Sequence, residues 1–319
     1  MNSRHLVDPE LAVVLDQLPS SSDLFTLESL PTIRAGSAAM LAGIPVPELP
    51  NRTVSERRVP GPEGAPDVRV LLYQPTQTTQ PTAALLWLHG GGYVSGSADA
   101  EDIAVRTMAA ELGCVVISVD YRLAPETPHP GPVEDCYAAL LWLYTNAAEL
   151  GVERERLAVG GSSAGGGLAA ALALLARDRG EIPLAFQVMN APMLDDRTVR
   201  VNPPHPYTGE FIWTREANRF GWTALLGQEP GSDGVSPYAA AARAENLAGL
   251  PLTFIGIGAL DLFLEENMEY VRRLTRAGVP TEFHVYPGTF HGYQMVAAAQ
   301  VTHVATRDRM NAIRRALKL

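Results

Sequence analysis

A serine between small residues stands at the centre of residues 161–165, where the chain reads GSSAG. This GxSxG pattern fits a nucleophile elbow, a sharp turn between a strand and a helix that exposes the serine hydroxyl. A second motif, HGGG, occupies residues 89–92, and the bare backbone of its glycines can donate N–H groups to an oxyanion. Either motif alone is weak, but the two have complementary roles and each follows an apolar run. Together they predict acyl transfer with Ser163 as the nucleophile.

A catalytic serine needs a base within hydrogen-bond reach and a third group that orients that base. Asp261 and His291 each follow one of the last two apolar runs of the chain. Because the carboxyl ends of parallel strands meet at one edge of a sheet, both side chains are expected to lie close to Ser163. Of the seven histidines, His291 alone combines this position with suitable flanks, whereas His89 is expected to brace the glycine loop. We therefore predict a triad in the chain order Ser163, Asp261, His291.

Three other carboxylates remain open as the acid of the triad. Glu265 lies four residues after Asp261 and could share its helical face. Asp195 and Asp196 follow the sixth apolar run, a position at which some serine hydrolases carry the acid. We favour Asp261, whose carboxylate would stabilise the imidazolium that forms when the base accepts the serine proton.

Three backbone N–H groups are predicted to form the oxyanion hole. Ala164 follows the nucleophile and begins a helix, where the first N–H groups have no partner within the helix and the helix dipole favours negative charge. Gly91 and Gly92 would add two donors, since glycine allows a close approach of the backbone to the substrate. The loss of one such donor costs about 3 kcal/mol of transition-state stabilisation.

Apolar runs bounded by turn residues alternate with helical patterns, which is typical of a mostly parallel sheet covered on both faces. The inner runs are continuous Val, Ile and Leu segments, as expected for strands buried on both sides. Eight strands are predicted, at residues 53–59, 68–75, 84–88, 115–119, 157–160, 185–190, 252–257 and 281–286. Helices are predicted at residues 100–112, 132–149, 164–178, 265–277 and 293–317. The expected fold class is α/β, with one eight-stranded, mostly parallel sheet and helices on both of its faces.

Two segments do not fit this repeating unit. Residues 1–48 precede the first strand, and their apolar side chains recur at helical spacing: Leu11, Val14, Leu15 and Leu18. Residues 192–235 form a long connection rich in proline and aromatic residues, and a connection of this length is usually functional or carries its own helices. We interpret both as cap segments over the serine in a single domain, residues 1–319, with residues 49–191 and 236–319 as its catalytic core. Helices that simply cover the sheet edge are the alternative.

Aromatic side chains near these motifs are candidates for the wall of a substrate pocket. The predicted pocket residues are Tyr93, Phe211, Trp213 and Trp222. Tyr93 directly follows the HGGG motif, and the other three belong to the second cap segment, which also contains Tyr207 and Phe220. An aromatic cap fits a closed pocket for short acyl groups and a bulky alcohol.

Composition excludes several classes of partner. The chain has 319 residues, 46% of them hydrophobic, and a formal net charge of −10. With no basic stripe to neutralise phosphates, neither a nucleic acid nor an anionic membrane is expected as a partner. The first residues lack the pattern of a secretory signal, so a cytoplasmic location is expected. The two cysteines, Cys114 and Cys136, are predicted to be buried hydrophobic residues rather than a disulfide.

Three motifs carry a resemblance to a known family: HGGGYVSG at residues 89–96, DYRLAPE at residues 120–126 and GSSAGGGLAA at residues 161–170. The chain resembles the bacterial hormone-sensitive-lipase-like carboxylesterases of the α/β-hydrolase fold over nearly its whole length, with a pattern most similar to heroin-esterase-like members. The resemblance implies a cap built from the two segments above and, in many members, a homodimer. It also implies that the DYRLAPE motif is mainly structural, so no catalytic role is expected for Tyr121, Arg122 or Glu126.

Two positions depart from the family pattern. Many members have Asp or Thr where this chain has Ser162, and Pro where it has Leu262. Ser162 should be tolerated because that position is not itself catalytic. Leu262 follows the predicted acid directly and keeps Glu265 open as the alternative.

The sequence thus predicts a serine carboxylesterase that hydrolyses short-chain acyl esters through a covalent acyl-enzyme. Its expected partner is a small-molecule ester, and neither a cofactor nor a metal ion is expected. The nearest alternative is an amidase or deacetylase that acts on aryl acetamides, since the same machinery could cleave an activated amide. A non-catalytic ligand-binding protein on the same fold, such as the plant gibberellin receptors that have lost the histidine, is disfavoured because all three triad residues are present. A lipase acting at oil interfaces is disfavoured because the acidic chain has no surface-seeking helix.

Overall fold

The computed structural model of the chain describes residues 3–17, 25–42, 46, 48–77 and 80–319. Its described residues contain one sheet of eight strands in the order β1-β2-β4-β3-β5-β6-β7-β8. The strands are β1 (Arg52–Val59), β2 (Val68–Pro75), β3 (Thr82–Leu88), β4 (Val115–Asp120), β5 (Val152–Ser162), β6 (Phe186–Asn190), β7 (Leu252–Gly258) and β8 (Thr281–Tyr286). β2 pairs antiparallel with β1 and with β4, and β3 to β8 are parallel. The predicted eight-stranded, mostly parallel sheet is confirmed.

The inner strands are buried on both sides, as their continuous apolar runs predicted. In β3, alternate side chains enter different cores: Leu86 and Leu88 belong to one apolar cluster, and Leu85 and Trp87 belong to the other. β5 begins five residues before the predicted strand at residues 157–160, with the sequence VERER. Because these residues are mostly charged and partly exposed, they form no apolar run that could have revealed the extension.

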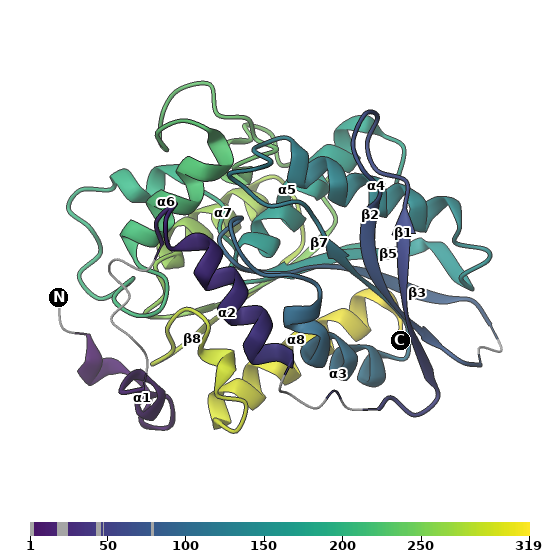
Figure 1. Ribbon diagram of the computed structural model, residues 1–319, viewed down its shortest axis with the longest axis horizontal. Helices are drawn as coiled ribbons and strands as arrows, with labels where there is room; N and C mark the ends of the chain where they lie inside the picture. Colours follow the sequence, from purple (N-terminus) through teal and green to yellow (C-terminus); the bar gives the residue numbers. More distant parts are fainter. Residues whose placement is uncertain (1–2, 18–24, 43–45, 47, 78–79) are drawn as a thin grey trace.

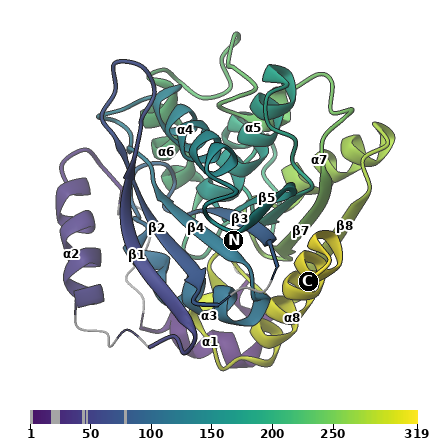
Figure 2. The same cartoon turned by 90° about the vertical axis from the view of Figure 1, so that its right-hand side faces the viewer.

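Helices cover both faces of the sheet (Figure 1, Figure 2). On one face lie α4 (Gly131–Thr145), α5 (Ala164–Arg179) and α7 (Leu264–Arg276), and on the other lie α3 (Asp102–Leu112) and α8 (Gln300–Leu317). α5 has buried residues over most of its length, from Ala164 to Ala176. The nucleophile motif therefore leads into the central helix of the fold.

Two predicted helices end or break earlier than expected. The helix predicted at residues 132–149 ends at Thr145, where the side chain of Asn146 donates a hydrogen bond of 2.8 Å to the carbonyl oxygen of Trp142. The helix predicted at residues 293–317 is interrupted between a short 3₁₀ turn, η5 (Tyr293–Met295), and the start of α8 at Gln300. Both Tyr293 and Ala299, on the two sides of the break, pack into one apolar cluster. Tertiary packing therefore overrides the local helical pattern here.

The N-terminal segment contains η1 (Arg4–Leu6), α1 (Pro9–Leu15) and α2 (Leu30–Ala42), whereas Leu18 lies outside the described residues. α1 begins at a capped proline, since the carboxylate of Asp8 accepts the N–H of Glu10. Its Leu11 is buried in the cluster that also contains Leu260 and Phe290. α1 thus packs beside the loops that carry the two predicted triad partners.

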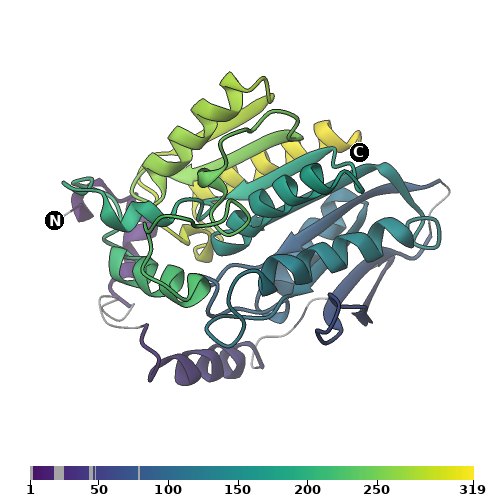
Figure 3. The ribbon, with the colours of Figure 1, turned by 90° about the horizontal axis from the view of Figure 1, so that it is seen from above.

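The connection between β6 and β7 contains η3 (Asp196–Arg200), α6 (Arg215–Leu226) and η4 (Ala241–Arg243). Seen from above, the N-terminal segment and the first half of this connection lie at the same end of the molecule (Figure 3). They touch directly: Ser3 donates a hydrogen bond of 2.6 Å to Glu210, and the ring of Phe25 lies 5.4 Å from that of Trp213. Segments far apart in sequence therefore form one layer.

Two further findings concern the described residues as a whole. Within the described ranges, no helix combines the length and the apolar character needed to cross a bilayer. Cys114 and Cys136 are both buried and free, as expected for small hydrophobic residues.

Candidate active site

Ser163 occupies the sharp turn between β5 and α5. Its backbone has φ 56° and ψ −120°, a region that residues other than glycine rarely adopt and that is typical of strained functional turns. The flanking glycines are required by close packing. A Cβ atom at Gly165 would lie 2.1 Å from the carbonyl oxygen of Leu88, and one at Gly161 would lie 2.4 Å from the carbonyl carbon of Gly165. The GxSxG pattern therefore reflects the space that this turn leaves.

The structure brings the three predicted triad residues together. Nε2 of His291 lies 2.9 Å from Oγ of Ser163, and Nδ1 of His291 lies 2.8 Å from Oδ2 of Asp261. Asp261 is 1% exposed and His291 is 8% exposed, whereas Ser163 is half-buried. The second carboxylate oxygen, Oδ1 of Asp261, accepts the N–H of Phe263 at 2.9 Å. The carboxylate is therefore fixed on one side by backbone and faces the imidazole on the other.

The predicted oxyanion donors face no competing acceptor. Gly91 and Gly92 have φ values of 122° and 62°, which glycine adopts without steric cost. Within the described residues, the backbone N–H groups of Gly91, Gly92 and Ala164 make no hydrogen bond. The N–H of Gly90, by contrast, is taken by the side chain of Glu101 at 2.8 Å. The N–H groups of Gly91, Gly92 and Ala164 are thus available to a ligand within the described residues, and their role as an oxyanion hole stays a prediction.

His89 braces the glycine loop, as expected. Its ring stacks on that of Tyr121 with centroids 4.1 Å apart, and its Nδ1 lies 2.8 Å from the carbonyl oxygen of Gly90. The hydroxyl of Tyr121 donates a hydrogen bond of 2.6 Å to the carbonyl oxygen of His89. Burial lowers the pKa of His89, so this imidazole is held neutral.

Comparison with known proteins agrees with this site. A family model described as "alpha/beta hydrolase fold" matches residues 85–295. The structure of a bacterial heroin esterase is 42% identical with a TM-score of 0.91 and covers 99% of both chains. Esterase LipW from Mycobacterium marinum is 33% identical with a TM-score of 0.82, over 99% of this chain and 97% of its own. Carboxylesterase NlhH from Mycobacterium tuberculosis is 35% identical over 98% of this chain and 96% of its own.

The chain belongs to the α/β-hydrolase fold family. Its relatives place it among the hormone-sensitive-lipase-like carboxylesterases, as the three motifs indicated, and it is a carboxylic ester hydrolase. The DYRLAPE segment of this esterase has structural contacts. Arg122 forms an ion pair with the buried Asp135, and Glu126 forms one with Arg34 of α2.

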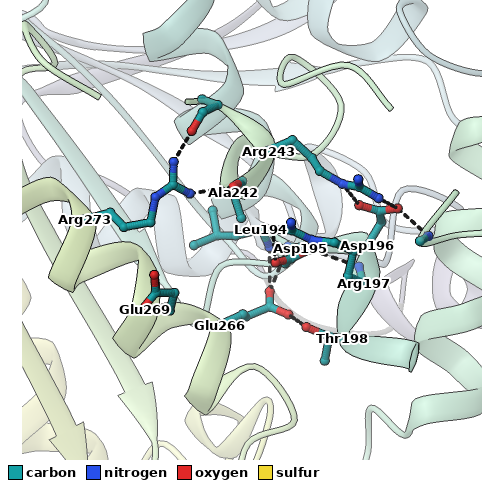
Figure 4. Close-up of polar contacts among 12 residues, drawn as sticks. Leu194, Asp195, Asp196, Arg197, Thr198, Ala242, Arg243, Glu266, Glu269 and Arg273 are labelled. Carbon is teal, nitrogen blue, oxygen red and sulfur yellow. Dashed lines mark hydrogen bonds and ion pairs between the residues drawn. The ribbon is translucent and has the colours of Figure 1, made fainter. Parts of the chain in front are cut away.

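The alternative acids of the esterase lie away from His291. Glu265 is exposed and borders a cavity of about 520 Å³ between η3 and the start of α7. Asp195 pairs with Arg197, and the buried Asp196 pairs with Arg243 (Figure 4). Among the described residues, none of these carboxylates makes a hydrogen bond to the imidazole. Asp261 is therefore the acid that the geometry favours.

Of the predicted pocket residues, Trp213 lies beside His291, and Phe211 lies against Phe290, the residue before His291. The ring of Trp213 lies 6.3 Å from that of His291, and its edge lies so close to Gly92 that an added Cβ would be 2.0 Å from Cη2. The ring of Phe211, which is half-buried, lies 5.7 Å from that of Phe290. Trp213 thus borders both the oxyanion loop and the base.

The other two predicted pocket residues are core residues, so their assignment to the pocket was wrong. Tyr93 and Trp222 are each 0% exposed, and their rings lie 5.2 Å apart within the main apolar cluster. The hydroxyl of Tyr93 donates a hydrogen bond of 2.9 Å to the carbonyl oxygen of Met193. An aromatic residue next to a motif can line the pocket or pack in the core beneath the motif, and the sequence alone does not distinguish these two positions.

The sequence did not predict the groups that fix the backbone of the glycine loop and of the nucleophile turn by hydrogen bonds. Glu101 accepts hydrogen bonds from the N–H of Gly90 and from the indole of Trp87. Met193, just after β6, donates its N–H to the carbonyl oxygen of Ser163 at 3.0 Å. These contacts join distant parts of the chain, and no local pattern signals them.

Proposed function

We propose that this esterase hydrolyses carboxylic esters through a Ser-His-Asp triad and a covalent acyl-enzyme. Nε2 of His291 accepts the proton of Ser163 as Oγ attacks the ester carbonyl carbon, and Asp261 stabilises the imidazolium that results. The imidazolium then gives its proton to the departing alcohol, and the acyl group stays on Oγ. Water attacks the acyl-enzyme, His291 takes its proton, and the acid leaves as Oγ regains a proton.

Charge on the tetrahedral intermediates needs donors at fixed positions. The N–H groups of Gly91, Gly92 and Ala164 would supply them, and the positive end of α5 adds to their effect. Such donors stabilise the transition state because they are already oriented and do not reorganise during the reaction.

The observation that carries the proposal is the pair of hydrogen bonds linking Ser163, His291 and Asp261, at 2.9 and 2.8 Å. A direct test is labelling with a fluorophosphonate, followed by mass spectrometry. Label on Ser163 and loss of nitrophenyl acetate hydrolysis in Ser163→Ala would support the mechanism. Turnover by Ser163→Ala at the wild-type rate would exclude it.

We infer a preference for short acyl groups because Trp213 lies against Gly92 and close to His291, which leaves little width beside the serine. A panel of nitrophenyl esters with acyl chains of increasing length tests this inference. We expect kcat/KM to fall steadily beyond short chains, and equal or rising values for long chains would contradict it. An aryl acetamide in the same panel tests the amidase alternative, which predicts turnover comparable with that of the matched ester.

We further propose that residues 1–48 and 192–235 act as a cap over the catalytic core. The contacts of Ser3 with Glu210 and of Phe25 with Trp213 support this division. A cytoplasmic location and a homodimer remain predictions, and light scattering after size-exclusion chromatography tests the second.

A further inference from the structure

A buried glutamate of α7 makes contacts that the proposed reaction does not use. Glu266 lies in the first turn of α7, five residues after Asp261, and is 8% exposed. Its Oε1 accepts the backbone N–H groups of Leu194 at 2.7 Å and of Asp195 at 3.2 Å, and its Oε2 is hydrogen-bonded to the hydroxyl of Thr198. Figure 4 shows this carboxyl group pointing from the helix into the turn that follows β6. One side chain thus satisfies three donors of a single short segment.

That segment is the support on which the nucleophile turn rests. The N–H of Met193 donates to the carbonyl oxygen of Ser163 at 3.0 Å, and the carbonyl oxygen of Met193 accepts the hydroxyl of Tyr93 at 2.9 Å. Tyr93 directly follows the predicted oxyanion donors. Displacement of Met193 would therefore move both the nucleophile and the loop of Gly91 and Gly92.

The helix that carries Glu266 also begins three residues after the acid of the proposed triad. The N–H of Leu264 donates to the carbonyl oxygen of Asp261, and the carboxylate of Asp261 accepts the N–H of Phe263. The next residue, Asn267, donates from its side chain to the carbonyl oxygens of Pro192 and Phe263 at 2.9 and 2.8 Å. The start of α7 thus contacts the segment after β6 through Asn267 and contacts Asp261 through the N–H groups of Phe263 and Leu264.

We propose that Glu266 is a positioning residue that holds the segment at residues 193–195 against α7. It thereby keeps Ser163 and the oxyanion loop at the correct distance and orientation relative to Asp261. The inference rests on the proposed triad mechanism. Its role is geometric: an oxygen must face the two backbone N–H groups, and a second polar atom must face Thr198. The length and shape of the side chain matter for this role, and its charge does not.

Two substitutions separate shape from hydrogen bonding. Glu266→Met keeps the approximate size but removes both acceptors, whereas Glu266→Gln keeps one oxygen for the two N–H groups and an amide for Thr198. A fluorophosphonate titration of one sample of each variant counts its reactive serines, and the turnover of nitrophenyl acetate by a separate, untreated sample is divided by that count to give kcat per site. We expect Glu266→Met to lower kcat per site by about tenfold to a hundredfold, because small misplacements of reacting groups have effects of this size. Glu266→Gln should retain kcat within about twofold, and KM should change little in either variant.

Arg273 offers a matched control on the same helix. Its guanidinium donates to the carbonyl oxygens of Ala242 and Ala244, so it is linked to residues 193–195 indirectly, through the N–H of Ala242, which donates to the carbonyl oxygen of Leu194 at 3.1 Å. Arg273→Met should lower the melting temperature but lower kcat per site much less than Glu266→Met does, because the contacts of Glu266 with Leu194, Asp195 and Thr198 remain. Equal loss of kcat per site in Arg273→Met and Glu266→Met would overturn the proposal, because general loosening of α7 would then explain both.

The kinetics of the Glu266 and Thr198 variants also test the positioning role of Glu266. Wild-type kcat per site in Glu266→Met, or an equal loss in Glu266→Gln, would overturn the geometric role. If Glu266→Met does not fold, Thr198→Val removes one of the three hydrogen bonds at almost constant shape, and we expect kcat per site to fall about threefold; an unchanged value would count against the proposal. Failure of Ser163 to react with the fluorophosphonate in the wild-type protein would instead show that the triad mechanism itself is wrong.

Discussion

The indole ring of Trp213 packs edge-on against the backbone of Gly92, although the two residues come from different layers of the molecule. A Cβ atom at Gly92 would lie 2.0 Å from Cη2 of the ring, and the residue has φ 62°. The connection between β6 and β7 and the predicted oxyanion loop are therefore in direct contact. Any side chain at Gly92 must displace one of them.

The first prediction follows from this contact. Gly92→Ala should lower kcat for nitrophenyl acetate by about a hundredfold, because displacement of one oxyanion donor costs about 3 kcal/mol of transition-state stabilisation. Steady-state kinetics measure the effect. Gly36→Ala is the control, since a Cβ at that position meets no other atom within 4 Å. Adding Trp213→Ala to Gly92→Ala should restore part of kcat if the clash dominates, and an unchanged kcat in Gly92→Ala alone would contradict the assignment.

The second prediction concerns the acid of the triad. Asp261→Asn should lower kcat by about four orders of magnitude, as for the equivalent change in another serine hydrolase, because the imidazole is then held in the wrong tautomer. Glu265→Gln should leave kcat within about twofold, since Glu265 is exposed and makes no hydrogen bond to His291 among the described residues. Collapse in Glu265→Gln with near-normal rates in Asp261→Asn would show that Glu265 is the acid.

The placement of the triad could be predicted because it depends on where strands end. Apolar runs located β7 and the end of β5, the mixed segment TEFHVY located β8, and the topology of a parallel sheet then brought their carboxyl ends together. The local motif was informative for a similar reason. Only glycine fits at positions 161 and 165, because a Cβ there would clash with backbone atoms. This steric limit appears in the sequence as the GxSxG pattern.

Long-range contacts left no such pattern. Glu101 and Glu266 each hold a backbone segment of the site, but they are separated in sequence from their partners and resemble ordinary helix residues. Tyr93 and Trp222 show the converse problem, because an aromatic residue near a motif can form the wall of a pocket or its support. Burial decides between these roles, and burial depends on packing that no periodicity encodes.

The third prediction concerns stability rather than catalysis. Asp196 is 0% exposed, and its two oxygens lie 2.8 and 2.9 Å from the guanidinium of Arg243. Arg243→Met leaves that carboxylate buried without its cation, which costs about 3 to 5 kcal/mol of unfolding free energy. Urea denaturation measures the loss. Arg272→Met removes an exposed ion pair with Glu269 and should leave the unfolding free energy unchanged. Equal effects of the two substitutions would contradict the argument.

The last prediction links the pKa of Glu266 to the pH dependence of stability. Burial raises the pKa of this carboxyl group well above its usual value of 4.5, and the nearby charge of Asp195 adds to the shift. The folded state then binds a proton that the unfolded state has lost, so unfolding free energy falls as pH rises. This contribution is fully present below about pH 4.5 and is lost as pH passes through the raised pKa of the folded protein.

Glu266→Gln removes this titration while keeping the hydrogen bonds, so it isolates the effect from the charges around it, including Asp195 and Arg197. Urea denaturation of both proteins across about pH 4.5 to 8 gives the difference in their unfolding free energies. We expect the wild-type protein to lose stability relative to Glu266→Gln as pH rises through this range. A difference that changes in the opposite direction would mean that the three donors around the carboxyl group outweigh its burial and hold it ionised. Because Glu266→Gln should also keep kcat per site, this one variant separates the effect of the charge of Glu266 on stability from the effect of its position on catalysis.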